Sequence, residues 1–289
     1  MSFPVETKTE ISRLRDEIRR GTRVISLSGL TSVSAKAFVL SELKRETVKT
    51  FVVLTDSNSE LESWECDLSF WRRGDAETRR YGDTDSTNNE QRTTNKILTL
   101  PSFESDIYSS VSPHAETQEK RALALWNLTF QTPDFLILSA KSLITKILAP
   151  DEIKNLGAVL RRDEDFPPEE LIEKLVACGY VREDPIANIG EFSLRGGIVD
   201  VWSPDAEMPV RIEFFGDTVD SIRQFDPETQ LSVQHLKEIS IAPMREFAAK
   251  PKDLKDWAVF ARERFEEEKF ARPLKDRTDF AAEGETFSG

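Results

Sequence analysis

The residues that come closest to a catalytic motif lie in the small-residue turn 29–36. A phosphate-binding P-loop reads G-x-x-x-x-G-K-[ST], where the lysine contacts the β- and γ-phosphates and the hydroxyl binds magnesium. In the register that begins at Gly29, Ser34 stands in place of the second glycine. Ala35 replaces the lysine, and Lys36 replaces the hydroxyl residue. Without that charge and that metal ligand we expect no nucleotide binding, and an ordinary strand-to-helix turn explains the same residues equally well.

The remaining reactive side chains form no recognisable catalytic or metal-binding pattern. The two histidines, His114 and His235, lack the spacing of a metal motif. The two cysteines, Cys66 and Cys178, are too few for a disulfide scaffold or a cysteine zinc site. The carboxylates are spread along the chain, and their spacing does not identify any pair that would act in general acid–base catalysis. We therefore expect no catalytic residue, no metal and no cofactor.

A second set of residues has the chemistry of protein recognition. Residues 210–215 read VRIEFF, and strand alternation places Arg211 and Phe215 on the face opposite the apolar core positions. The same alternation places Arg195 on the outer face of residues 191–195, EFSLR. Arginine and aromatic side chains dominate protein–protein hot spots, where guanidinium–carboxylate pairs surround an aromatic anchor. These residues therefore predict a partner-binding surface.

A structural interpretation of the same residues fits the pattern equally well. In that interpretation Arg211 pairs with Glu213 or Glu191 across the sheet, and Phe215 lies under a neighbouring loop. Strand alternation alone does not choose between the two.

The first half of the chain is expected to hold helices between short apolar strands, at 23–27, 50–54, 97–100 and 135–138. Unbroken apolar strands alternating with helices are typical of a mostly parallel sheet covered on both faces. The polar stretch 72–96 is expected to be a surface loop. Ser142 is expected to cap a short helix. The pattern thus predicts an α/β region.

From about residue 190 the apolar period becomes two, which is typical of an antiparallel sheet. Four strands are expected, at 191–195, 198–202, 210–215 and 218–225. Gly216-Asp217 indicates a tight hairpin between the last two. A helix that opens at Pro167-Pro168 and ends at Gly179 precedes them, and another helix is expected at 253–272.

Length and charge narrow the class of protein. The chain has 289 residues, enough for about two domains, with 39 Lys and Arg against 52 Asp and Glu and a net charge of −13. The negative net charge argues against a protein that wraps nucleic acid, because binding phosphates needs clustered basic residues. Neither a membrane-spanning apolar run nor a signal peptide is visible, so we expect a reducing cytoplasm and no membrane partner.

One long stretch carries a resemblance. Residues 190–230, GEFSLRGGIVDVWSPDAEMPVRIEFFGDTVDSIRQFDPETQ, resemble the signature shared by UvrB and the transcription-repair coupling factors (Mfd). Residues 100–128, with their S-P-H motif, resemble Mfd as well. The degenerate turn and the presence of only three tyrosines favour Mfd, because UvrB keeps an intact P-loop and a tyrosine-rich hairpin.

The resemblance implies a degenerate RecA-like (P-loop-like) parallel sheet at 1–150, an inserted α+β UvrA-binding domain at 151–243 and a return segment at 244–289. It also implies that Arg195, Arg211 and Phe215 contact UvrA. UvrB has a basic residue where this chain has Ser193, which strand alternation also places on the outer face.

The implied function is that of the N-terminal part of a bacterial transcription-repair coupling factor. Such a part is a non-catalytic adaptor that recruits UvrA to RNA polymerase stalled at DNA damage during nucleotide excision repair. Its other implied partners are the parent's ATP-dependent translocase motor and RNA polymerase-binding domains, for which this chain would also be a scaffold. The alternative is a nucleotide-hydrolysing UvrB-like repair protein with DNA contact, and we do not expect direct DNA contact here.

Overall fold

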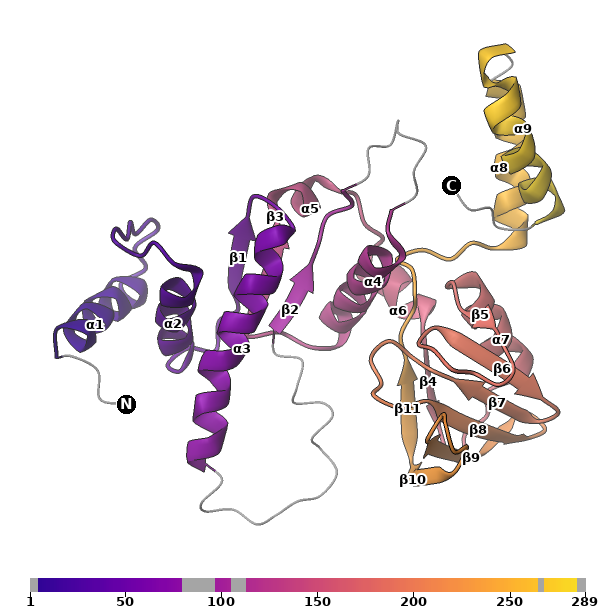
Figure 1. The fold of residues 1–289 in the computed structure, drawn as a ribbon, viewed down its shortest axis with the longest axis horizontal. Helices are drawn as coiled ribbons and strands as arrows, with labels where there is room; N and C mark the ends of the chain where they lie inside the picture. Colours follow the sequence, from indigo (N-terminus) through magenta and orange to yellow (C-terminus); the bar gives the residue numbers. More distant parts are fainter. Residues whose placement is uncertain (1–4, 80–96, 105–112, 265–267, 285–289) are drawn as a thin grey trace. The chain divides into compact units, whose positions relative to one another are not determined.

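The chain divides into two compact units, each of which is described by itself (Figure 1). A computed structural model describes residues 5–79, 97–104, 113–264 and 268–284. The first unit combines Met1–Ser102 with Gln131–Thr145, and the second combines Phe103–Phe130 with Lys146–Gly289. The segments 1–150, 151–243 and 244–289 that the resemblance implies remain a prediction.

The first unit contains a parallel sheet in the order β1-β3-β2. Its strands are β1 (Phe51–Thr55), β2 (Ile97–Leu100) and β3 (Phe135–Ser139), which confirms three of the four expected strands. The fourth prediction is wrong, because residues 23–27 form no strand and both Val24 and Leu27 are exposed. An apolar run of five residues becomes a strand only when a neighbouring strand pairs with it, and no strand of the described residues pairs with this one.

The helices of this unit are α1 (Val5–Arg19), α2 (Val33–Lys44), α3 (Ser59–Arg79) and α5 (Ala140–Ile144). Buried side chains of α2 and α3 pack with Val53, Phe135 and Ile137 on one face of the sheet. The expectation that both faces are covered is wrong at β1, where Val52 and Leu54 are exposed.

Two local predictions in the first unit also differ from the structure. The prediction of a loop is wrong for residues 72–79, which belong to α3; the remaining residues of that prediction, 80–96, lie outside the described part of the chain. Ser142 lies inside α5, whose cap position is Ser139, and donates a hydrogen bond to the Leu100 carbonyl instead.

The second unit is built around a six-stranded sheet in the order β10-β9-β8-β7-β6-β5. The strands are β5 (Val181–Arg182), β6 (Glu191–Arg195), β7 (Ile198–Val201), β8 (Val210–Phe215), β9 (Thr218–Phe225) and β10 (Ser232–Leu236). A two-stranded sheet pairs β4 (Ala158–Arg161) with β11 (Glu238–Ile241). Its helices are α4 (Ala115–Phe130), α6 (Pro150–Leu156), α7 (Pro168–Ala177), α8 (Pro251–Arg264) and α9 (Glu268–Glu283).

The four strands and the α7 helix expected between residues 167 and 225 are confirmed. Gly179 follows α7 with φ +96°, a backbone conformation that glycine adopts without a side-chain clash. The other strands of this unit, and α6 and α9, were not expected. The helix expected at 253–272 is two helices, α8 and α9.

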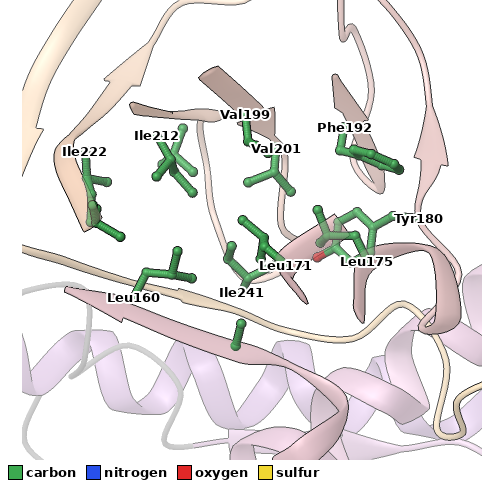
Figure 2. Close-up of a cluster of buried hydrophobic side chains, with 13 residues drawn as sticks. Leu160, Leu171, Leu175, Tyr180, Phe192, Val199, Val201, Ile212, Ile222 and Ile241 are labelled. Carbon is green, nitrogen blue, oxygen red and sulfur yellow. The ribbon is translucent and has the colours of Figure 1, made fainter. Parts of the chain in front are cut away.

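The core of the second unit lies on one face of the six-stranded sheet (Figure 2). Val199, Val201, Ile212 and Ile222 point from the strands toward Leu171 and Leu175 of α7 and toward Leu160 and Ile241 of the two-stranded sheet. Each of these positions alternates with a residue on the opposite face, so the inner face supplies the hydrophobic stabilisation. The opposite face is left for polar chemistry.

The two cysteines should differ sharply in reactivity. Burial raises the pKa of the Cys178 thiol to about 11, and its sulfur donates a hydrogen bond to the Leu156 carbonyl. Because the thiolate is the reactive form, Cys178 should react only after unfolding, whereas the exposed Cys66 should react at once. An Ellman titration at pH 8 checks this, and fast labelling of Cys66→Ser would contradict it.

Candidate protein-binding surface

The outer face of the six-stranded sheet carries a row of polar residues across four strands. Ser193 on β6 pairs in register with Asp200 on β7, and Asp200 pairs with Arg211 on β8. Arg211 in turn pairs with Arg223 on β9. Because residues in register on neighbouring strands share a face, these four side chains lie side by side. Arg195 is two residues beyond Ser193 on the same face.

The centre of this row is the Asp200 carboxylate, which is only 2% exposed. Arg211 donates to it through Nε at 2.7 Å from Oδ1 and through Nη2 at 2.9 Å from Oδ2. Arg195 donates from Nη2 to the same Oδ2 at 2.5 Å. Bidentate guanidinium–carboxylate pairs are among the strongest and most directional hydrogen-bonded contacts in proteins. One buried carboxylate therefore holds both arginines.

The two arginines differ in their surroundings. The Arg211 side chain is 16% exposed, donates a further hydrogen bond to Gln230 at 3.0 Å, and lies 4.5 Å above the ring of Phe225. Its hydrogen bond to Asp200 raises the pKa of its guanidinium. The Arg195 side chain is 45% exposed and lies 3.6 Å from Asp184 at the surface. Arg211 is thus fixed within the face, while Arg195 presents guanidinium surface to solvent.

Phe215 is the aromatic residue of this face and is 84% exposed. It lies four residues beyond Arg211 on β8, so the two are roughly 13 Å apart along the strand. The β-bulge of the β8–β9 pair falls on β9, so β8 keeps its alternation and Phe215 stays on the outer face.

The hairpin that carries Phe215 is held in place by backbone pairing. Its turn begins at Gly216 with φ +62°, and the segment before α7 runs alongside it. The Phe166 amide donates to the Asp217 carbonyl at 2.7 Å, and the Asp163 amide donates to the Val219 carbonyl at 2.8 Å. Because the backbone of the turn is already ordered, only the side chain of Phe215 loses conformational freedom when a partner covers it.

The sequence-predicted residues of this surface therefore share one face, as alternation indicated. The structural interpretation has the wrong partners: Glu213 pairs with Arg223, and Glu191 accepts from the amides of Ala187 and Asn188. It is also wrong about Phe215, which no loop covers.

The burial of two residues on this face was not predicted from the sequence. Ser193 is only 1% exposed although alternation places it outward, and Arg211 is largely buried. The residue that sequence reasoning missed is Asp200. A signal was present, since Asp200 is an acidic residue inside the apolar strand IVDV and closes the G-E-x-x-x-R-G-x-x-x-D motif.

Residues 29–32 form the turn before α2 and follow a segment without a strand, whereas residues 33–36 are the first turn of α2. Gly29 has φ +86°, and Ser32 caps α2 by accepting a hydrogen bond from the Ala35 amide at 3.2 Å. This is the geometry of an ordinary helix start. That Ser34, Ala35 and Lys36 hold no nucleotide stays a prediction.

Ligands of open α/β sheets bind at the carboxyl ends of the strands, and here polar groups at those ends bond to one another. The Ser102 amide donates to the Asn58 side chain at 2.9 Å, and the Asn58 amide group donates back to the Ser102 carbonyl at 2.8 Å. The hydroxyls of Ser139 and Ser142 lie 3.1 Å apart. These polar groups thus satisfy one another's hydrogen bonds within the first unit.

The residues within the described ranges hold no cluster of three or more His, Cys, Asp or Glu side chains that could bind a metal ion. Within the same ranges, no helix combines the length and apolar character needed to cross a bilayer.

Comparison with known families defines the class of the second unit. Residues 159–247, which include the whole outer-face row, match the UvrB interaction domain family. The chain is 34% identical over 232 residues, 80% of its length, to the transcription-repair-coupling factor of Myxococcus xanthus. It is 33% identical over 228 residues, 78% of its length, to that of Staphylococcus haemolyticus and 27% identical over 157 residues, 54% of its length, to that of Escherichia coli.

These matches confirm the resemblance: the chain is a relative of the transcription-repair-coupling factors and carries a UvrB interaction domain. It spans 18% of the Myxococcus and Staphylococcus proteins and 14% of the Escherichia protein.

Because Arg211 is largely buried and Phe215 is exposed, replacing each with alanine should change the free energy of unfolding by different amounts. Arg211→Ala should lower the free energy of unfolding by about 2 kcal/mol, because it removes two of the hydrogen bonds that compensate the buried Asp200. Phe215→Ala should change it by less than about 0.5 kcal/mol, because the ring is exposed. Urea denaturation followed by circular dichroism measures both, and equal effects would contradict the burial of Arg211.

Proposed function

We propose that the outer face of the six-stranded sheet binds UvrA, with Arg195, Arg211 and Phe215 as its contact residues. The observation that carries the proposal is that one face of a UvrB interaction domain presents two arginines and a highly exposed phenylalanine. Exposed aromatic and arginine side chains on a rigid scaffold are the residues that dominate binding energy at protein interfaces.

The charges of this face suggest the chemistry of the partner. Two guanidinium groups share the single carboxylate of Asp200, and Arg195 is half exposed. The second carboxylate near Arg195 is the exposed Asp184, 3.6 Å away, and a carboxylate of the partner would compete with it for a charge-assisted hydrogen bond from Arg195. The Phe215 ring would enter an apolar pocket roughly 13 Å along β8 from Arg211, which fixes the orientation of the complex.

In the wider assembly, we propose a non-catalytic adaptor that couples transcription to nucleotide excision repair in the bacterial cytoplasm. The resemblance supports this role, in which UvrA is recruited to RNA polymerase stalled at DNA damage. Contacts with a translocase motor and an RNA polymerase-binding domain belong to the same proposal, as does a RecA-like origin for the first unit. The net charge of −13 fits a protein partner better than nucleic acid.

UvrA binding should depend on the exposed anchor residues. Phe215→Ala and Arg195→Ala should each weaken UvrA affinity by about 2 kcal/mol if they are hot spots, because each removes side-chain surface that is exposed before binding. Isothermal titration of the chain with purified UvrA measures the effect.

Phe280→Ala is the matched control, because Phe280 is an exposed phenylalanine on α9, outside the UvrB interaction domain. We expect wild-type affinity for this variant. Wild-type affinity for both Phe215→Ala and Arg195→Ala would rule out the proposed surface.

The alternative, a nucleotide-hydrolysing protein, makes the opposite prediction about ATP. The turn 29–36 offers an alanine and a lysine where a P-loop needs a lysine and a hydroxyl, so we expect no binding of Mg–ATP and no hydrolysis. Equilibrium dialysis with labelled ATP and a phosphate-release assay test this. Micromolar binding that Lys36→Ala leaves intact would show a nucleotide site elsewhere, and binding that Lys36→Ala abolishes would revive the P-loop.

A further inference from the structure

We propose that Asp200 is the positioning residue of this surface: its buried carboxylate sets the orientation of Arg195 and Arg211 before the partner arrives. The inference rests on the proposed function and adds to it a residue that does not itself need to contact UvrA. With only 2% of its surface exposed, Asp200 is almost inaccessible to a partner. Any effect it has on binding must pass through its neighbours.

The carboxylate is itself rigidly placed. Asp200 lies on β7, which pairs with β6 on one side and with β8 on the other. In register it faces Ser193 and Arg211, so backbone hydrogen bonds of both ladders fix its Cα. A group anchored in the middle of a sheet is a fixed reference point for long side chains that reach it.

The hydrogen bonds that the structure describes for this carboxylate all come from the two arginines. Arg211 occupies both oxygens, at 2.7 and 2.9 Å, and Arg195 occupies Oδ2 at 2.5 Å. Ser193 does not hold the carboxylate, since its buried hydroxyl has no hydrogen-bond partner in the described structure. The two guanidinium groups therefore converge on one atom, Oδ2, and their separation is set by that shared contact.

Pre-ordering is valuable for these side chains in particular. Arginine has many rotamers, and fixing a free arginine at an interface costs conformational entropy that subtracts from affinity. Because Asp200 orders the two arginine side chains during folding, their conformational entropy is already lost before UvrA binds. Replacing the carboxylate with a neutral amide leaves two guanidinium groups that repel each other, and the half-exposed Arg195 is then held by the exposed carboxylate of Asp184 and no longer by a buried one.

The same face offers a matched control carboxylate. Glu213 lies on β8 between Arg211 and Phe215, pairs with Arg223 and accepts a hydrogen bond from Ser221. It acts on Arg211 through its charge, and neither a hydrogen bond nor an ion pair with Arg195 or Arg211 is described for it. Glu213→Gln removes one negative charge from the same face, as Asp200→Asn does, but leaves the guanidinium pair on Asp200 in place. A difference between the two variants therefore reports positioning and not the net charge of the surface.

The test is a pair of double-mutant cycles in UvrA affinity, measured by titration of the full chain with purified UvrA at a temperature where thermal melts show every variant folded. Asp200→Asn alone should weaken binding by about tenfold, a hot-spot-sized loss, whereas Glu213→Gln should bind as the wild type does. In the Arg195→Ala background the effect of Asp200→Asn should fall to a few-fold or less, because the more exposed of the two arginines it positions is gone and only Arg211 remains. In the Phe215→Ala background the full effect should persist.

A merely structural role for Asp200 predicts the same loss in both backgrounds, and that result would overturn the inference, as would wild-type affinity for Asp200→Asn. If Asp200→Asn does not fold, Asp200→Glu keeps the charge and displaces the shared oxygen by one methylene. We expect about tenfold weaker binding for it as well, and unchanged affinity would overturn the inference. Loss of the effects of Arg195→Ala and Phe215→Ala would instead refute the proposed UvrA surface.

Discussion

The outer face of the UvrB interaction domain depends on the compensation of one buried charge. A carboxylate that is removed from water is strongly unfavourable unless charged donors surround it. Asp200 is such a carboxylate, and its donors come from the strands on either side, Arg195 from β6 and Arg211 from β8. Because Asp200 lies on β7, compensation of its charge links β6, β7 and β8 through side-chain hydrogen bonds as well as through backbone ones.

This arrangement lets one sheet perform two tasks. Its inner face packs valine and isoleucine side chains against α7 and the two-stranded sheet, and that burial stabilises the domain. Its outer face carries an ordered polar row, with Phe215 exposed at one end. Since the residues alternate along each strand, a change on the outer face need not disturb the packing of the inner one. Arg211 is the exception, because its stacking on Phe225 and its bond to Gln230 make it part of both the surface and the fold.

Strand alternation was sufficient to predict which face carries Arg195, Arg211 and Phe215, because alternation is a local property of the chain. It was not sufficient to predict how deep each residue lies. Gln230, which bonds to Arg211, belongs to the loop after β9, and the pattern of β8 contains no information about that loop. The same limit explains why β4 and β11 were missed: Arg161 pairs with Glu238, far along the chain, and each strand has only four residues. Residues 23–27 show the opposite error: a strand was predicted for this apolar run, and none of the described strands pairs with it.

The strand order of the first unit has a consequence for the time course of synthesis. β3 lies between β1 and β2, yet it is the last of the three to be translated. Neither earlier strand has a neighbour until Phe135–Ser139 has been made, and by then α4, which belongs to the other unit, has already been translated. Synthesis of the second unit therefore begins before the first unit is complete, and β1 and β2 wait for β3 while the ribosome reads through the intervening segment.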